Sequence, residues 1–197
     1  VAILFYNYPP GEKNLSASYM NLPRSLEASL RALREAGYRT ETPGETELTL
    51  LLQRLLAPYY DPPGDQRELE SLLRDGLAEL LPVSAYRSWL DRLPPAVVEA
   101  LRARWGEPEQ SSMVVRRKGE AYFAVPRLKL GNVALLPQPP RGERREAAEK
   151  ALYHDTTARP SHFYLAAYLW VRGGLRADAL VHFGTHGTQE WQPGKER

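Results

Sequence analysis

The 197-residue sequence contains no cysteine, and this absence excludes disulfides, thiolate metal sites, iron–sulfur clusters and a cysteine nucleophile. Any bound metal must therefore be held by nitrogen and oxygen ligands. Long apolar runs are missing as well, because the longest, residues 163–171, is far shorter than the roughly 20 residues that cross a bilayer. We therefore expect a cytoplasmic protein with no membrane span.

Charge of one sign is not concentrated anywhere along the chain. The 26 basic and 24 acidic residues are interspersed and leave a net charge of +2, so we expect no nucleic-acid partner. The phosphate-binding pattern Gly-x-x-x-x-Gly-Lys-Ser/Thr is also absent, so we expect ATP not to bind here. The chain opens on an apolar run without an initiator methionine or a signal peptide, and we expect it to be a fragment of a longer protein.

Apolar runs of strand length alternate with helical patterns. These runs cover residues 1–6, 132–136 and 177–183. The alternation predicts an α/β fold, with a largely parallel sheet and flanking helices. Ligands of such sheets lie beyond the carboxyl ends of the strands, so we expect Asn7, Gln138 and His182 to meet there.

Residues 46–106 have a different pattern, because leucines recur at helical spacing and β-branched runs vanish. Asp65 and Ser84 are candidate helix caps, and Pro94-Pro95 can start a further helix. We therefore expect a helical insertion at 46–106. The α/β core would then consist of residues 1–45 and 107–197.

Other local signals predict individual elements. Asn21 and Ser161 can each cap a helix, and the helix after Ser161 is apolar on all sides, which indicates burial on most faces. Residues 38–42 are a candidate short strand. Two extended runs around a basic turn, within residues 113–125, predict a hairpin.

The end of the chain carries the strongest functional signal. His182 ends an apolar strand, and His186 and Glu190 follow at spacings of four residues. Gly184 and Gly187 would each cost a helix about 1 kcal/mol, so a strand-end histidine followed by a loop is favoured. Imidazole and carboxylate groups suit a borderline divalent metal, and the same groups can exchange protons. The alternative is that His182 bonds to backbone at the core edge while the other two stabilise the loop.

Two further regions hold candidate binding residues. His154 and His162 precede the apolar helix. The alternative is that their neighbours Asp155, Thr156 and Ser161 are loop and cap residues, and that His162 lies in a solvated first helical turn. Proline-rich loops after two of the strands could hold Asn7, Gln138 and Arg141 for a ligand. Such loops can also simply connect elements.

Short sequence motifs, which occur in the same order over most of the chain, resemble those of the large subunit of cobaltochelatase, the CobN type. They resemble the related H subunit of magnesium chelatase less closely. The motifs are Asn7-Tyr-Pro-Pro-Gly, residues 82–95, Arg104-Trp-Gly-Glu-Pro, Gly131-Asn-Val, residues 138–142, residues 153–156, residues 160–170 and the final motif that begins at His182. The departures are Gln189 and Gln192, which stand where the family usually has leucine.

The resemblance implies a metal chelatase that inserts cobalt into a corrin-type tetrapyrrole during cobalamin biosynthesis. Insertion of magnesium into protoporphyrin is the alternative. It also implies that separate AAA+ subunits hydrolyse ATP, and that the fragment alone is inactive. In this scheme His182, His186 and Glu190 bind the metal and accept pyrrole protons.

The remaining candidates would bind the substrate. Lys195 and Arg141 could pair with peripheral carboxylates of the tetrapyrrole. Asn7, Gln138, His154 and His162 are the other candidate substrate-binding residues.

Two other classes of function compete with this interpretation. A metal-dependent hydrolase could use His182, His186 and Glu190 to hold zinc and a bound water. A noncatalytic module could dock the AAA+ motor through the helical insertion, with histidines that are only structural.

Overall fold

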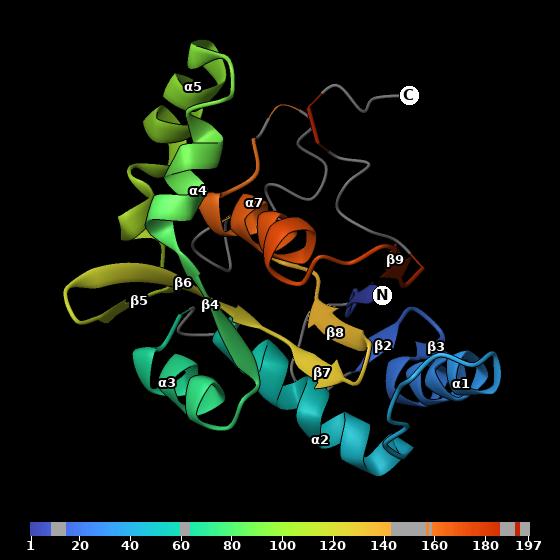
Figure 1. The fold of residues 1–197 in the computed structure, drawn as a ribbon. Helices are drawn as coiled ribbons and strands as arrows, with labels where there is room; N and C mark the ends of the chain where they lie inside the picture. Colours follow the sequence, from blue (N-terminus) through green and yellow to red (C-terminus); the bar gives the residue numbers. More distant parts are fainter. Residues whose placement is uncertain (9–14, 60–63, 143–156, 158, 186–191, 194–197) are drawn as a thin grey trace.

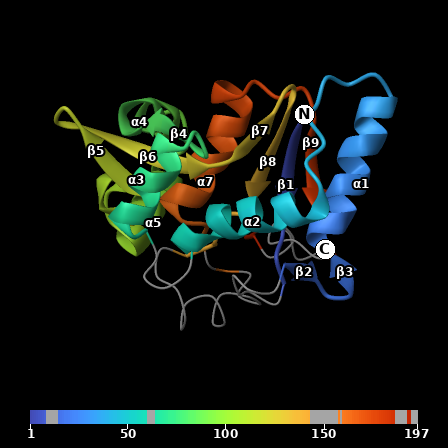
Figure 2. The ribbon, with the colours of Figure 1, turned by 90° about the horizontal axis from the view of Figure 1, so that it is seen from below.

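The computed structural model describes residues 1–8, 15–59, 64–142, 157, 159–185 and 192–193. Figure 1 shows the ribbon, and Figure 2 shows it after a rotation of 90°. The candidate site residues His154, His186, Glu190 and Lys195 lie outside the described residues.

The main sheet contains four strands in the order β7-β8-β1-β9. They are β7 (Leu128–Leu130), β8 (Val133–Pro137), β1 (Ala2–Phe5) and β9 (Leu180–Phe183). β1 pairs in parallel with both β8 and β9, whereas β7 is antiparallel to β8. The predicted α/β class is confirmed, and the carboxyl ends of β8, β1 and β9 lie at one edge.

Burial explains why the strands read as continuous apolar runs. β1 and β8 are buried along their whole length, as expected for parallel strands covered on both faces. β9 lies at the edge of the sheet, and its Leu180 and Val181 are 40% and 41% exposed. The apolar pattern of this strand therefore does not signify burial in the described chain.

Helices α1 (Leu22–Glu35), α2 (Glu45–Leu56) and α7 (His162–Leu169) pack near the main sheet. The predicted caps are present, because the side chain of Asn21 accepts a hydrogen bond from the backbone N–H of Arg24 and Ser161 caps α7 in the same way. α2 packs against α1 and β8 (Figure 2). α7 is buried on most faces, as its apolar sequence predicts, and a π-helical turn at Trp170–Gly174 follows it.

A second, antiparallel sheet has the order β4-β6-β5. Its strands are β4 (Ala78–Pro82), β5 (Val114–Arg117) and β6 (Glu120–Pro126). The predicted hairpin is confirmed as β5 and β6, and its turn places Lys118 and Gly119 at positive φ.

β4 is a correction to the prediction that residues 46–106 are helical. Gly76, at φ 67°, ends the preceding helix, and the few residues up to Pro82 are too short for another. Pairing with β6 satisfies their backbone groups instead. Because β4 pairs with β6 and α2 packs on β8, the span is joined to both sheets. Its boundaries at residues 46 and 106 stay a prediction.

The other helices of this span are α3 (Gln66–Arg74), α4 (Val83–Leu90) and α5 (Pro95–Trp105). Asp65 caps α3 as predicted, but α4 begins before Ser84, with Pro82 at its N-cap. Single turns lie at η1 (Ala57–Tyr59) and η2 (Pro108–Gln110). None of the helices in the described ranges is long and apolar enough to cross a bilayer.

The predicted strand at residues 38–42 is wrong. The carbonyl of Arg39 accepts a hydrogen bond from the backbone N–H of Asn132, but no ladder forms. The two-residue strands β2 (Ser16–Ala17) and β3 (Met20–Asn21) form a small hairpin that periodicity did not predict.

Candidate functional site

The loops after three neighbouring parallel strands begin at the same edge of the main sheet. Backbone hydrogen bonds carry the pairing one step beyond the strands, from Tyr6 N–H to the Phe183 carbonyl and from Gln138 N–H to the Phe5 carbonyl, at 2.9 and 2.8 Å. Asn7, Gln138 and His182 are therefore brought to this edge, as the order of strands and helices predicted.

Asn7 is buried, and its side chain forms a hydrogen bond with the backbone of another segment. Its side-chain oxygen accepts a hydrogen bond of 3.0 Å from the N–H of Ser16, at the start of the β2-β3 hairpin. At the tip of that hairpin, the Ser18 hydroxyl lies 3.2 Å from the hydroxyl of Thr185. Asn7 thereby helps to position the hairpin against the loop that follows β9.

Gln138, Tyr168 and His182 form a contiguous cluster at the strand ends. Gln138 is 6% exposed, and its amide nitrogen and oxygen lie 3.1 and 3.3 Å from the Tyr168 hydroxyl. The Tyr168 ring is stacked on the exposed imidazole of His182, with centroids 6.0 Å apart and planes 23° apart. The cluster fixes one face of His182 and leaves the residue accessible.

Sequence reasoning did not single out Tyr168. The helix that carries it is apolar and aromatic on all sides, so its periodicity gives no preferred functional face. The one local signal is the spacing of four residues from Tyr164, whose ring lies 5.1 Å from that of Tyr168. Both tyrosines line an apolar groove of about 400 Å³ between α5 and α7.

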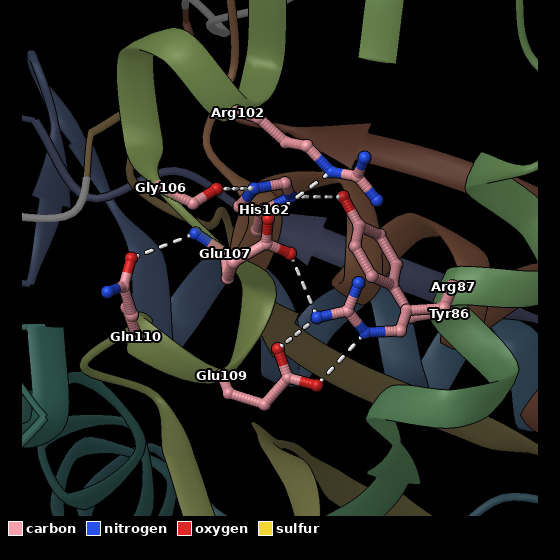
Figure 3. A network of polar contacts seen from close by, with 8 residues as sticks. All are labelled: Tyr86, Arg87, Arg102, Gly106, Glu107, Glu109, Gln110 and His162. Carbon is pink, nitrogen blue, oxygen red and sulfur yellow. Dashed lines mark hydrogen bonds and ion pairs between the residues drawn. The ribbon is translucent and has the colours of Figure 1, made fainter. Parts of the chain in front are cut away.

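His162 lies in the first turn of α7 but is only 1% exposed, so the alternative that it is solvated is wrong. Its Nε2 is 3.0 Å from the carbonyl oxygen of Gly106, and its Nδ1 is 2.9 Å from the Tyr86 hydroxyl (Figure 3). A carbonyl can only accept, so Nε2 carries a proton. In the neutral ring, Nδ1 then accepts from Tyr86.

An ion-pair network holds the loop that supplies the Gly106 carbonyl (Figure 3). The guanidinium of Arg87 bonds to both oxygens of Glu109, at 3.0 and 2.5 Å, and to Glu107 at 2.9 Å. The hydrogen bond from Arg87 lowers the pKa of the Glu109 carboxyl. His162 is thus placed by contacts with α4 and with the loop after α5.

Arg141, which follows the end of β8 at Pro137 by four residues, is buried. Its carbonyl accepts a hydrogen bond of 2.9 Å from the N–H of Ser161, the cap of α7. This hydrogen bond therefore connects the segment after β8 with the start of that helix.

The predicted metal site is only partly within the described residues. His182 is described, but His186 and Glu190 are not, and neither are the candidate substrate-binding residues His154 and Lys195. Among the described residues, no group of three histidine or acidic side chains is arranged to hold a metal ion. The metal-binding set stays a prediction.

The whole chain, residues 1–197, matches the family CobN/Magnesium Chelatase. It is 37% identical over 196 residues to the aerobic cobaltochelatase subunit CobN of Pseudomonas aeruginosa, covering 99% of this chain and 15% of that protein. It is 29% identical over 196 residues to the magnesium-chelatase H subunit of Chlorobaculum parvum, covering 98% of this chain and 14% of that protein.

Among solved structures, the catalytic subunit of cobaltochelatase from Mycobacterium tuberculosis is similar, with a TM-score of 0.69 and 30% sequence identity. The match covers 98% of this chain and 15% of that one. The chain therefore spans only a small part of the relatives' length. These matches confirm the resemblance inferred from the sequence.

Proposed function

The chain belongs to the CobN/magnesium chelatase family, and we propose that it serves as a tetrapyrrole-binding part of an ATP-dependent cobaltochelatase. The reaction is the insertion of cobalt into a corrin-type tetrapyrrole in cobalamin biosynthesis. Identity to the CobN subunit of Pseudomonas aeruginosa, 37%, supports cobalt over magnesium, because the magnesium-chelatase relative from Chlorobaculum parvum is 29% identical. Magnesium insertion into protoporphyrin is the second candidate.

The observation that supports a site in this chain is the cluster at the carboxyl edge of the main sheet. An exposed imidazole, His182, lies there beside the buried Gln138 and the partly buried Tyr168. In the sequence it precedes His186 and Glu190 by four and eight residues. Ligand sites of α/β sheets form at this edge. Imidazole is also a better ligand for cobalt than for magnesium, which prefers oxygen.

Metal insertion requires that water leave the ion, that the central pyrrole protons be removed and that the ring be held out of plane. In this proposal His182, His186 and Glu190 bind the metal ion and accept the pyrrole protons. Lys195 and Arg141 would pair with peripheral carboxylates, while Asn7 and His154 would orient the ring. Gln138 would act through Tyr168, whose hydroxyl both of its polar side-chain atoms contact. His162 is given an architectural role instead, because both of its ring nitrogens are bonded inside the protein.

In this proposal, the ATP hydrolysis that drives metal insertion takes place in other subunits. The sequence has no P-loop pattern, so ATP would be hydrolysed by AAA+ partner subunits. A cytoplasmic location, expected from the sequence, is part of the same proposal.

A chelatase assembly that contains this chain and its AAA+ partners tests the proposal. With ATP, cobalt and a metal-free corrin-type tetrapyrrole, the absorption spectrum should shift to that of the cobalt complex, and magnesium with protoporphyrin should react more slowly. An assembly that inserts neither metal would refute the proposed function. Faster magnesium insertion would reverse the choice of metal.

A further inference from the structure

An apolar groove is lined by residues of α5, of α7 and of the end of α4 with the segment after it. Figure 1 shows where these helices lie. Trp89, Leu93 and Val97 line one wall, and Tyr164 and Tyr168 line the other. Trp89, Leu93 and Val97 are only partly buried, so their side chains are accessible from the groove. The volume, about 400 Å³, lies within the range of small-molecule sites, roughly 300–1,000 Å³.

Aromatic rings lead from this groove to the strand edge. The ring of Tyr164 lies 5.1 Å from that of Tyr168, and the ring of Tyr168 lies 6.0 Å from the imidazole of His182. The interplanar angles are 31° and 23°, so these ring faces are inclined only slightly to one another. A molecule in the groove therefore adjoins the residue to which we assign metal binding.

One cation lies at this apolar surface. Among the described residues that line the groove, Arg159 alone is charged. No acidic side chain in the described ranges forms an ion pair with it. Its backbone is held in place, because its carbonyl accepts a hydrogen bond of 3.2 Å from the indole N–H of Trp105. A ligand that complements this groove would have a flat apolar body for the apolar walls and a peripheral anionic group for Arg159.

We propose that this groove seats the tetrapyrrole ring between its apolar walls, with one peripheral carboxylate on Arg159. The inference rests on the proposed function and adds to it the surface that binds the ring. Aromatic faces stack favourably on a conjugated ring, and a guanidinium can bind a carboxylate through paired hydrogen bonds. Seated in this way, the ring has an edge near His182.

Binding of deuteroporphyrin IX, a flat tetrapyrrole with free propionates, to the chain tests the inference. Tryptophan fluorescence reports binding, because Trp89 lies in the groove wall and its emission should be quenched. Trp89→Phe should reduce the quenching, and the remaining tryptophans should still report binding.

Arg159→Gln should weaken binding of this porphyrin about tenfold, equivalent to about 1.4 kcal/mol. Arg24→Gln, the same loss of charge on the exposed side of α1, should leave the affinity unchanged. A porphyrin with N-methylpyridinium groups in place of propionates should lose no affinity in Arg159→Gln.

Val97→Trp should fill the groove and reduce the affinity by more than about tenfold, because an overfilled site cannot admit the ring. Ala96→Trp, on the exposed face of α5 one residue earlier, is its matched control and should bind normally. Far-UV circular dichroism establishes that both variants fold. If Val97→Trp does not fold, Arg159→Glu decides, because it must weaken binding more than Arg159→Gln does.

Wild-type affinity in the folded Val97→Trp and Arg159→Gln variants would overturn the inference, and a groove that docks a protein segment would give this result. Failure of the folded wild-type chain to bind the porphyrin would overturn it as well. The proposed function fails separately, when the assembly inserts no metal. Normal metal insertion by an assembly carrying Val97→Trp would refute the groove and retain the proposed function.

Discussion

Replacing Tyr168 by phenylalanine removes only the hydroxyl that both polar atoms of the Gln138 amide contact. Gln138 is 6% exposed, and the structure describes no other hydrogen-bond partner for its side chain. Leaving a buried polar group without its partner costs about 1–3 kcal/mol. We expect Tyr168→Phe to lower the free energy of unfolding by about 2 kcal/mol, which for a chain of this size lowers Tm by roughly 4–8 °C.

A double-mutant cycle separates this hydrogen bond from packing. Gln138→Leu should also be destabilising, but replacing both partners by apolar groups of similar shape can be nearly neutral. The double variant should therefore be more stable than the sum of the two losses predicts, with a coupling free energy of about 1–2 kcal/mol. Urea unfolding followed by circular dichroism measures all four proteins. A coupling free energy indistinguishable from zero would refute the hydrogen bond between Gln138 and Tyr168.

Further expectations concern one backbone position and one ion pair. Gly64→Ala should cost more than about 2 kcal/mol of unfolding free energy, because a Cβ there would lie 2.0 Å from the carbonyl oxygen of Ser112 at a φ of 69°. In Gly119→Ala, at φ 84° with open space around the Cβ, urea unfolding should show a loss of only about 1 kcal/mol. Arg87 lowers the pKa of Glu109, so this pair should stabilise the fold above the ordinary carboxyl pKa of 4.5, and the effect should be lost as the pH falls below it. Urea midpoints of wild type and Glu109→Gln should therefore differ at pH 7 and converge as the pH falls through the lowered pKa of Glu109, and a constant difference would contradict the assignment.

Local sequence patterns were sufficient where one segment determines its own structure. The apolar runs that became β1 and β8 are buried on both faces, so their sequences carry a continuous signal. Asn21, Asp65 and Ser161 cap helices through hydrogen bonds to backbone N–H groups a few residues away. Such caps depend on neighbours in sequence and can be predicted from it.

Elements that depend on distant partners were not predictable in this way. β4 is a strand because β6 is beside it, and its leucines fit a helical pattern equally well. The burial of His162 depends on Tyr86 and Gly106, which are far away in the sequence. Tyr168 became a candidate only when the fold placed its ring on His182.

The candidate site was predicted to the extent that strand order determines it. Asn7, Gln138 and His182 follow or end parallel strands, and these strands proved to be neighbours. The side-chain contacts could not be inferred, because they involve a hairpin and a helix whose positions no local pattern specifies. The roles of His186 and Glu190 remain predictions from the sequence.

The most direct test of the central claim is to measure metal insertion and tetrapyrrole affinity side by side in a chelatase assembly carrying Glu190→Gln. The substitution keeps the shape and hydrogen-bonding capacity of the side chain and removes the charge that would bind metal or accept a pyrrole proton. We predict that insertion is abolished while the affinity for the tetrapyrrole stays near that of the wild type. An assembly that inserts metal at the wild-type rate would contradict the account and remove Glu190 from the site.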